Sequence, residues 1–236
     1  MNKKLIMPKH LGIIMDGNGR WATNRGLNRS MGHKAGADTL KKLCLYMEKL
    51  GIEYVSLYAF STENFKRNSK EVSFLMNLFI ELFTNEFQVI IDNNIKVIFS
   101  GRRENLSKKV LDAMDEVSRK TSNNTGCVLN ICLNYGSRFE IVDMTRKVCS
   151  LVVDGKLSID DINIDTINKN LYQDIPDLDL VIRTGGESRL SNFMLYQASY
   201  AEFYFSKTLF PDFLEDDLLV AIKEYNNRTR KFGGNV

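Results

Sequence analysis

Runs of apolar and β-branched residues alternate along the chain with stretches in which apolar residues recur every three or four positions. Runs of the first kind are typical of buried strands, and the recurring spacing is typical of amphipathic helices. The predicted strands cover residues 11–15, 54–61, 95–100, 127–134, 178–182 and 202–206. The predicted helices cover residues 33–50, 68–92, 104–120, 138–153 and 214–230, with one more starting at Ser158. This alternation predicts an α/β fold whose mostly parallel six-stranded sheet carries helices on both faces.

Some helix boundaries carry their own signals. Gly51 is expected to stop the helix over 33–50, and Asn68 with Glu71 resembles a capping box at the start of the next. Residues 72–83 are apolar on nearly every side, so this part of the helix is expected to be deeply buried.

Composition and charge narrow the class of protein. The 236 residues are 44% hydrophobic and show no repeat or Pro/Gly-rich linker, which fits a single well-cored domain over residues 1–236. The 32 basic and 29 acidic residues leave a net charge of +3, too balanced for a general nucleic-acid binder. Four cysteines without a C-x-x-C pair and only two histidines indicate neither a zinc site nor a disulfide framework. Without an apolar signal or spanning segment, we expect a cytoplasmic protein.

The stretch IIMDGNGRW, residues 13–21, runs from a predicted strand directly into a glycine loop. Ligands of α/β proteins bind at that end of the strands. Residues 17–22 match the G-x-G-x-x-A pattern of dinucleotide-binding proteins, but the second strand ends near residue 61, too far on to supply the ribose-binding acid. A nucleotide site is therefore disfavoured.

The charges around this loop favour a different anion. Between Gly17 and Ala37 the chain carries Arg20, Arg25, Arg29 and Lys34 and no acidic residue. The carboxylate of Asp16 would repel a diphosphate held by these groups unless a divalent cation lay between them, which indicates Mg²⁺. An ordinary turn beside a solvated basic face is about equally compatible with this stretch alone.

A second basic turn and a mixed third loop follow two other strands. Arg183, Arg189 and Ser191 surround the bend at residues 185–186, and guanidinium groups bind phosphate oxygens with fixed geometry. Two such clamps indicate two phosphorylated substrates or one long one, although exposed loop arginines are the plainer alternative. In the third loop, over 56–68, polar residues stand among aromatic ones, which suits an amphiphilic ligand. The apolar helix at 72–83 could line a hydrocarbon channel, but core packing is its commoner role.

Several ordered motifs resemble those of the cis-prenyltransferases, with the bacterial undecaprenyl diphosphate synthases as the closest likeness. They are IMDGNGRWA, GHKAGA, LYAFSTEN, NTG with LNYG, DLVIRTGGE, and the segment from SNFMLYQ through AEFYF. The resemblance extends from about residue 10 to 234. It implies a homodimeric, Mg²⁺-dependent enzyme with a hydrophobic tunnel, which adds isopentenyl diphosphate to an allylic starter, typically farnesyl diphosphate. The implied product is a polyprenyl diphosphate for cell-wall lipid carrier synthesis, or alternatively a short- or medium-chain Z-prenyl diphosphate.

The resemblance also assigns roles to residues. It implies that Asp16 and Glu202 bind the metal, with Glu202 near the dimer interface, and that Asn64 takes part in proton removal. Because an amide is a poor base, we expect Asn64 to orient a water molecule or a phosphate oxygen. The positions implied to hold the allylic diphosphate are Gly17, Asn18, Gly19, Arg20, Arg29 and His33. Those implied for isopentenyl diphosphate are Arg183, Arg189, Leu190 and Ser191, and further substrate contacts are Trp21, Ser61, Thr62, Glu63, Phe65 and Arg67.

The chain departs from the family pattern at four positions. Ser188 replaces a histidine, Phe65 a tryptophan, Ser137 a glycine and Lys231 an arginine. Lys231 lacks the planar guanidinium fork, so Lys231→Arg is expected to lower the KM for isopentenyl diphosphate.

Two alternatives and two open features complete the sequence-based interpretation. The alternatives are a Rossmann-type enzyme and a non-catalytic supporting subunit, and the presence of Asp16 and of the first clamp argues against the second. The small Ala59 favours long products, and transient contact with a membrane surface would suit a lipid product.

Overall fold

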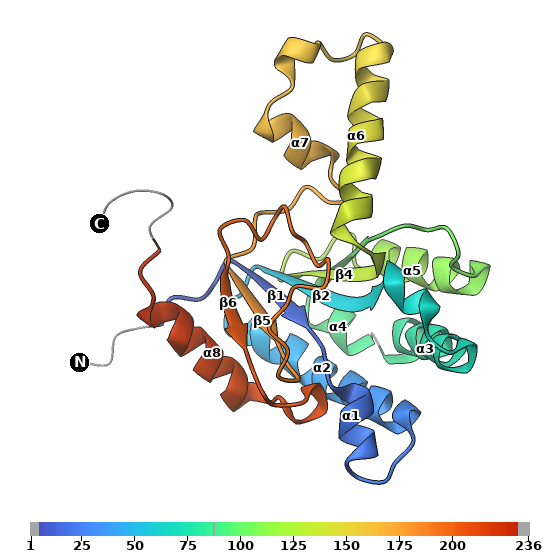
Figure 1. Cartoon of the computed structure of the whole chain (residues 1–236), viewed down its shortest axis with the longest axis vertical. Coiled ribbons are helices and arrows are strands. Elements are labelled where there is room, and N and C mark those ends of the chain that lie inside the picture. The colour runs from blue at the N-terminus through green and yellow to red at the C-terminus, as the bar shows by residue number, and fades with distance from the viewer. Residues whose placement is uncertain (1–4, 87, 231–236) are drawn as a thin grey trace.

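The sheet of the computed structural model, which describes residues 5–86 and 88–230, contains six strands in the order β3-β4-β2-β1-β5-β6 (Figure 1). The strands are β1 His10–Ile14, β2 Tyr54–Ser61, β3 Lys96–Ser100, β4 Val128–Tyr135, β5 Leu180–Arg183 and β6 Glu202–Phe205. Each predicted strand is confirmed to within two residues at either end. Every pairing between neighbouring strands is parallel. The carboxyl ends of the strands therefore meet at one edge of the sheet.

Helices connect most of these strands. They are α1 Asn18–Thr23, α2 Arg29–Lys49, α3 Ser69–Glu81, α4 Gln88–Asp92, α5 Lys108–Lys120, α6 Ser137–Val153, α7 Ile164–Asn170 and α8 Glu215–Asn227. Short turns of 3₁₀-helix are η1 Thr62–Lys66, η3 Ile159–Asp161 and η4 Phe210–Asp212, and η2 Leu82–Glu86 is a π-helical turn. The prediction of one helix over 68–92 is wrong, because η2 interrupts it. The short α1 was not predicted, and Ser158 caps only η3, whereas α7 starts after Asn163.

The start of α3 agrees with only half of the predicted capping box. The Asn68 side chain accepts a hydrogen bond from the backbone N–H of Lys70, as an N-cap should. Glu71 instead accepts hydrogen bonds from Arg29 of α2 and from Arg67, which follows η1. Burial of α3 is also less complete than predicted, because Leu75, Leu78 and Phe79 are buried while Val72 is only half-buried.

The two faces of the sheet are covered differently. Leu11 and Ile13 of β1 belong to the main apolar core, to which α2, α3, α5 and α8 contribute. This helical layer agrees with the prediction. Ile14 and Val181 face the other way and pack on Phe193 and Met194 of the irregular segment 190–201. Part of the second face is therefore covered by coil, and this coil carries one of the predicted clamps.

The helices α6 and α7 project together from the sheet (Figure 1). They pack on each other through a small cluster that includes Met144, Val148 and Leu171. Within residues 5–86 and 88–230, no helix is long and apolar enough to cross a membrane.

Candidate active site

Most of the predicted site residues converge at the point where the strand order reverses. From β1 the chain proceeds to β2 on one side, whereas β5 pairs with β1 on the other, so a crevice lies between the ends of β1 and β5. Crevices of this kind bind ligands in open α/β sheets. A cavity of 450 Å³ opens here, and we call it the polar cavity. Its lining includes Asp16, Gly17, Asn18, Gly19, Arg20, Arg29, His33, Ser61, Asn64, Arg67, Arg183, Arg189 and Ser191.

Glycines allow the first loop to form and let α2 lie close beside it. Gly17 has φ of 110°, and a Cβ there would lie 2.8 Å from Leu209 Cδ2. A Cβ on Gly32 of α2 would lie 1.9 Å from the carbonyl oxygen of Asn18. A side chain at Gly32 would push α2 away from α1, and one at Gly17 would collide with Leu209. The glycines of the first loop and of GHKAGA thus keep α1 and α2 in contact beside the polar cavity.

Asp16 lies between two arginines at the floor of the polar cavity. Arg183 Nη2 donates to Asp16 Oδ2 at 2.9 Å, and Arg20 Nη2 lies 3.3 Å from Oδ1. The backbone N–H of Asp16 also donates to Thr184 Oγ1 at 2.9 Å. These contacts join the loop after β1 to the turn after β5 and fix the direction of the carboxylate.

Arg183 is the buried centre of the second predicted clamp, the one formed with Arg189 and Ser191. Its side chain is only 5% exposed, and Nη1 donates to Ser191 Oγ at 2.7 Å and to the carbonyl oxygen of Arg189. Ser191, Asn192 and Met194 all have positive φ, a backbone conformation that costs energy for residues other than glycine. Arg189 is the exposed member of the clamp, since its side chain is 60% exposed and pairs with Glu187.

Glu71 is a site residue that the sequence analysis interpreted only as a helix cap. It accepts hydrogen bonds of 3.2 Å from Arg29 Nε, Arg29 Nη2 and Arg67 Nη1. Burial acts to raise the pKa of Glu71, but the hydrogen bonds and charge of Arg29, with the charge of Arg67, outweigh it and hold the pKa low. Glu71 is therefore ionised and neutralises two cations of the polar cavity. The spacing of Arg67 and Glu71, four residues apart near a helix start, is the sequence signal that could have indicated the pair.

His33 and Asn18 lie where the polar cavity meets an apolar one. Burial lowers the pKa of His33, against the opposing effect of the Glu71 carboxylate, so the imidazole is neutral at pH 7. Asn18 Oδ1 is buried without a hydrogen-bond partner among the described residues, whereas His33 Nε2 lies 3.5 Å from Glu71 Oε1. Buried polar atoms rarely stay unpaired, which indicates a place for a ligand group or water.

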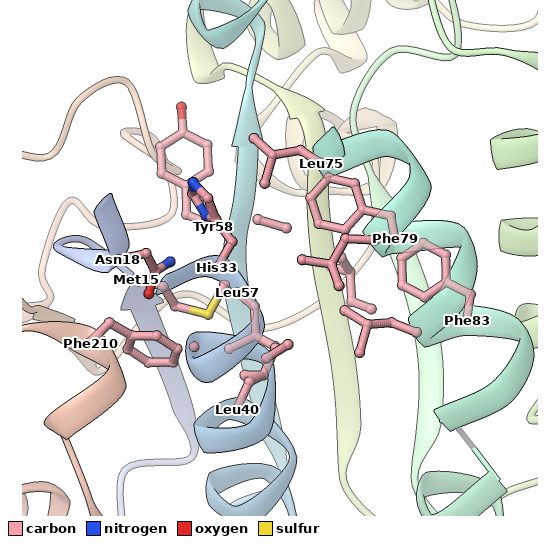
Figure 2. Close-up of a pocket in the computed structure, with 16 residues that line it drawn as sticks. Met15, Asn18, His33, Leu40, Leu57, Tyr58, Leu75, Phe79, Phe83 and Phe210 are labelled. Atoms are coloured by element: carbon pink, nitrogen blue, oxygen red, sulfur yellow. The ribbon is translucent and has the colours of Figure 1, made fainter. Parts of the chain in front are cut away.

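The adjoining apolar cavity measures 90 Å³ and shares Met15, Tyr58, Ala59 and Leu75 with the polar cavity. Figure 2 shows Leu75, Phe79 and Phe83 on one side of it, and Asn18, His33 and Tyr58 on the other. Ala59 lies at a β-bulge, where the register between β2 and β4 shifts. The two cavities together offer a charged half and an apolar half to one ligand, and the tunnel stays a prediction.

The η1 turn places Asn64 at the wall of the polar cavity. Asn64 Oδ1 accepts a hydrogen bond of 3.1 Å from the backbone N–H of Ser61, in a capping box with the Ser61 side chain. The amide oxygen is therefore engaged, and the NH₂ group is the part of Asn64 left for a ligand. This arrangement suits an orienting donor better than a proton acceptor.

Five of the predicted substrate contacts do not line the polar cavity. Trp21 Nε1 donates to Asp212 Oδ1 at 2.7 Å, and Glu63 Oε1 accepts from Asn192 Nδ2 at 3.0 Å. Thr62 and Phe65 line a different cavity on the far side of η1, and Leu190 packs in the apolar cluster of the second sheet face. Their assignment as substrate contacts stays a prediction.

The two predicted metal ligands do not meet within one chain. Glu202 pairs with Leu180 at the start of β5, whereas Asp16 contacts Arg183 at its end, roughly 10 Å along the strand. Glu202 Oε2 instead accepts from Arg228 Nη1 at 2.8 Å. Residues 5–86 and 88–230 hold no group of three or more His, Cys, Asp or Glu side chains arranged for a metal ion. Lys231 lies outside the described residues.

Comparisons with known proteins identify the family of the chain. The family model Prenyltransf, described as "Putative undecaprenyl diphosphate synthase", matches residues 14–233. An isoprenyl transferase from Fusobacterium nucleatum is 47% identical over 228 residues, with 97% of this chain and 96% of the relative covered. One from Clostridium perfringens is 49% identical over 229 residues, with 97% and 90% covered.

Solved structures extend the likeness to the fold. Lavandulyl diphosphate synthase from Lavandula x intermedia, in complex with dimethylallyl diphosphate, superposes with a TM-score of 0.91 at 36% identity, over 96% of this chain and 98% of that one. A probable undecaprenyl diphosphate synthase from Campylobacter jejuni gives a TM-score of 0.81 at 34% identity, with 97% and 100% covered. The chain is a prenyl transferase and belongs to the undecaprenyl diphosphate synthase family of cis-prenyltransferases.

Proposed function

We propose that the protein condenses isopentenyl diphosphate repeatedly with an allylic diphosphate, with farnesyl diphosphate as the starter, and that the reaction requires Mg²⁺. The observation that carries this proposal is the polar cavity at the strand switch point, which continues into an apolar cavity. An allylic diphosphate has the same division into a charged head and an apolar chain. The bound dimethylallyl diphosphate of the lavandulyl diphosphate synthase supports the same ligand class.

The charge of the polar cavity suits diphosphate. Its lining includes the five arginines Arg20, Arg29, Arg67, Arg183 and Arg189. They are paired with three carboxylates, those of Asp16, Glu71 and Glu187, which leaves a net charge of +2 from these eight groups. Two diphosphates carry more negative charge than this surplus, so a divalent cation would complete the balance.

Asp16 fits the role of a magnesium ligand. Its carboxylate is 31% exposed, lines the polar cavity and is fixed in direction by two arginines. Magnesium is commonly held by one or two carboxylates together with substrate phosphates and water, so a single protein carboxylate suffices. When bound, the ion would offset charge on the departing diphosphate.

The residues of the polar cavity can support each step of the condensation. Arg20 and Arg29 would stabilise the electron pair that the departing diphosphate keeps when the allylic C–O bond breaks. The double bond of isopentenyl diphosphate then forms the new C–C bond, and a proton leaves its adjacent carbon. Asn64 offers an N–H to orient a phosphate oxygen that accepts this proton, because the amide oxygen is already bonded to Ser61.

We propose undecaprenyl diphosphate, for a cell-wall lipid carrier, as the product. The hydrocarbon chain of this product needs far more volume than the 90 Å³ of the apolar cavity. The wall formed by α3 and η2 must therefore move to open a tunnel. The break at η2 provides a place for that movement, since π-helical turns weaken the regular helix. The small cavity itself favours the second candidate, a short- or medium-chain Z-prenyl diphosphate synthase.

A homodimer is part of the proposal. Large apolar side chains stay exposed on the α6–α7 region and at the edge strand β6, among them Val153, Ile164 and Phe205. Exposed apolar groups of this kind are typical of an interface, and the second copy could bring its Glu202 to the metal site. Light scattering at micromolar concentration tests the dimer, and a monomer there would contradict it. The released lipid product would bring the protein to a membrane surface transiently.

Product analysis tests the function directly. The purified protein is incubated with farnesyl diphosphate, labelled isopentenyl diphosphate and Mg²⁺, and the products are sized by chromatography. Long polyprenyl products that disappear with excess chelator are expected. Products that stop after one or two additions would establish the short-chain candidate, and no condensation under any condition would contradict both.

A further inference from the structure

A second cavity lies behind the wall of the polar cavity. It measures 640 Å³, within the range of small-molecule sites, and lies at the ends of β3 and β4. The η1 turn separates the two cavities, because Ser61, Asn64 and Arg67 line the polar cavity while Thr62, Phe65 and Lys66 line the second. We call this second space the η1 cavity. None of the reactions described above uses it.

One wall of the η1 cavity is rigid and partly aromatic. Arg102 donates two hydrogen bonds to Asp143 of α6, at 2.8 and 2.7 Å, and its guanidinium carbon lies 4.1 Å from the ring centre of Phe139. Tyr172 Oη also donates to Asp143, at 2.6 Å. Since Asp143 is engaged on both oxygens, this wall is formed before any ligand arrives. Phe65 and Phe139 offer flat apolar surfaces.

The remaining charges favour an anion. Lys66 makes no salt bridge within residues 5–86 and 88–230. Arg146 is 77% exposed at its side chain, and its contact with Asp143 is 3.9 Å long. Glu104 is the other acid, so three cations and two carboxylates line the η1 cavity, with a net charge of +1. Arg102 already neutralises Asp143, which leaves Lys66 and Arg146 available to a ligand.

We propose that the η1 cavity is a second small-molecule site, for a ligand with one flat apolar group and one anionic group, and that its occupancy changes turnover through η1. The apolar group would lie against Phe65 and Phe139, and the anion would bind Lys66 and Arg146. η1 is a single five-residue turn closed by the Ser61–Asn64 capping box. A shift of Phe65 or Lys66 therefore also moves Asn64 and Arg67. This coupling rests on the proposed function, whereas the binding site does not.

The binding test uses 1-naphthyl phosphate as the probe and isothermal titration calorimetry as the measurement. The polar cavity is first saturated with the non-reactive thiolo analogue of farnesyl diphosphate together with isopentenyl diphosphate. One site per chain is expected, and Arg146→Glu should weaken binding by roughly tenfold. Lys147→Glu is the matched control, because this exposed neighbour on α6 makes the same charge change outside the cavity lining. It should bind the probe like the unmodified protein.

Three results would overturn the site. They are no binding of the probe, its exclusion by the farnesyl analogue, and equal loss in Arg146→Glu and Lys147→Glu. The coupling is tested by turnover at saturating farnesyl and isopentenyl diphosphate with and without the probe. A changed kcat in the unmodified protein, absent in Arg146→Glu, supports the coupling. An unchanged kcat with the probe bound rejects it, and failure of condensation without probe would count against the proposed function alone.

Discussion

The polar and apolar cavities adjoin each other but differ in how completely they are formed. In the polar cavity, Arg183 is held by Asp16, Ser191 and a backbone carbonyl, and Arg29 and Arg67 are held by Glu71. The apolar cavity has a volume of only 90 Å³, and the helix on one side of it ends in a π-helical turn. The difference indicates that the head-group site is preorganised, whereas the chain site opens when the substrate enters.

The largest expected effect comes from removing the charge at the floor of the polar cavity. Asp16→Asn keeps the shape of the side chain but removes the carboxylate, so kcat/KM should fall by roughly a thousandfold, on the scale of lost transition-state stabilisation. Steady-state kinetics measure this. Asp38→Asn is the control and should retain activity, because this exposed acid of α2 pairs with Lys41 and does not line the polar cavity. Equal activity in both variants would remove Asp16 from the proposed chemistry.

The next effect concerns a buried chain of hydrogen bonds that links neighbouring strands of the sheet. His10 Nε2 accepts from Ser56 Oγ at 2.8 Å, Ser56 Oγ accepts from Asn130 Nδ2 at 3.0 Å, and Ser100 Oγ donates to Asn130 Oδ1 at 2.8 Å. His10 Nδ1 donates to the carbonyl oxygen of Pro176 at 2.6 Å. This buried chain crosses four parallel strands. Hydrogen bonds of this kind, fully paired inside the sheet, stabilise the folded chain.

Burial lowers the pKa of His10 from 6.5 to about 4. Between pH 6.5 and 4 the unfolded chain therefore binds a proton at His10 that the folded chain does not. The stabilisation that comes from burying the neutral His10 ring is complete above pH 6.5 and is lost as the pH falls toward 4. About 3 kcal/mol of the free energy of unfolding should disappear over this window. Denaturant titrations at several pH values measure the loss. His33 contributes in the same direction, so the His10 ring is also followed by NMR, and titration of that ring near pH 6.5 would contradict the assignment.

A larger side chain at Ala59, where the polar and apolar cavities meet, should affect the chain site but not the head-group site. Ala59→Leu would place a larger side chain where both cavities share a wall, at the β-bulge of β2. We expect shorter products with a KM for farnesyl diphosphate changed by no more than about threefold, because the head-group contacts remain. Product sizing measures the first and kinetics the second. Unchanged product length would show that the chain does not pass Ala59.

The smallest expected effect concerns Glu71, which pairs with Arg29 and Arg67 when no diphosphate is bound. Glu71→Gln removes the charge that a diphosphate must displace from Arg29 and Arg67. The Kd for farnesyl diphosphate without Mg²⁺ should fall by about threefold, which is typical of a half-exposed ion pair. Calorimetry provides the value. Weaker binding would mean that Glu71 holds the arginines in place for the ligand instead of competing with it.

The sequence predicted those parts of the molecule that depend on local patterns. All six strands follow from their apolar runs, and the residues around Asp16 and Arg183 are brought together because parallel strands share one carboxyl edge. It did not predict the break at η2, because residues 68–92 keep their apolar character through it. The role of Glu71 was also missed, since a capping residue and a counter-ion look alike until α2 and α3 are placed side by side. The coil over the second sheet face depends on left-handed residues such as Ser191 that no propensity favours.

An experimental structure with a bound allylic diphosphate tests the central claim most directly. The claim is that the polar cavity receives the diphosphate and the apolar cavity receives the chain. We predict the diphosphate within hydrogen-bond distance of Arg20, Arg29 and the Gly19 N–H, with Glu71 displaced from Arg29 and the first isoprene unit beside Ala59. A diphosphate bound elsewhere, or a chain directed away from Ala59 and Leu75, would contradict the account.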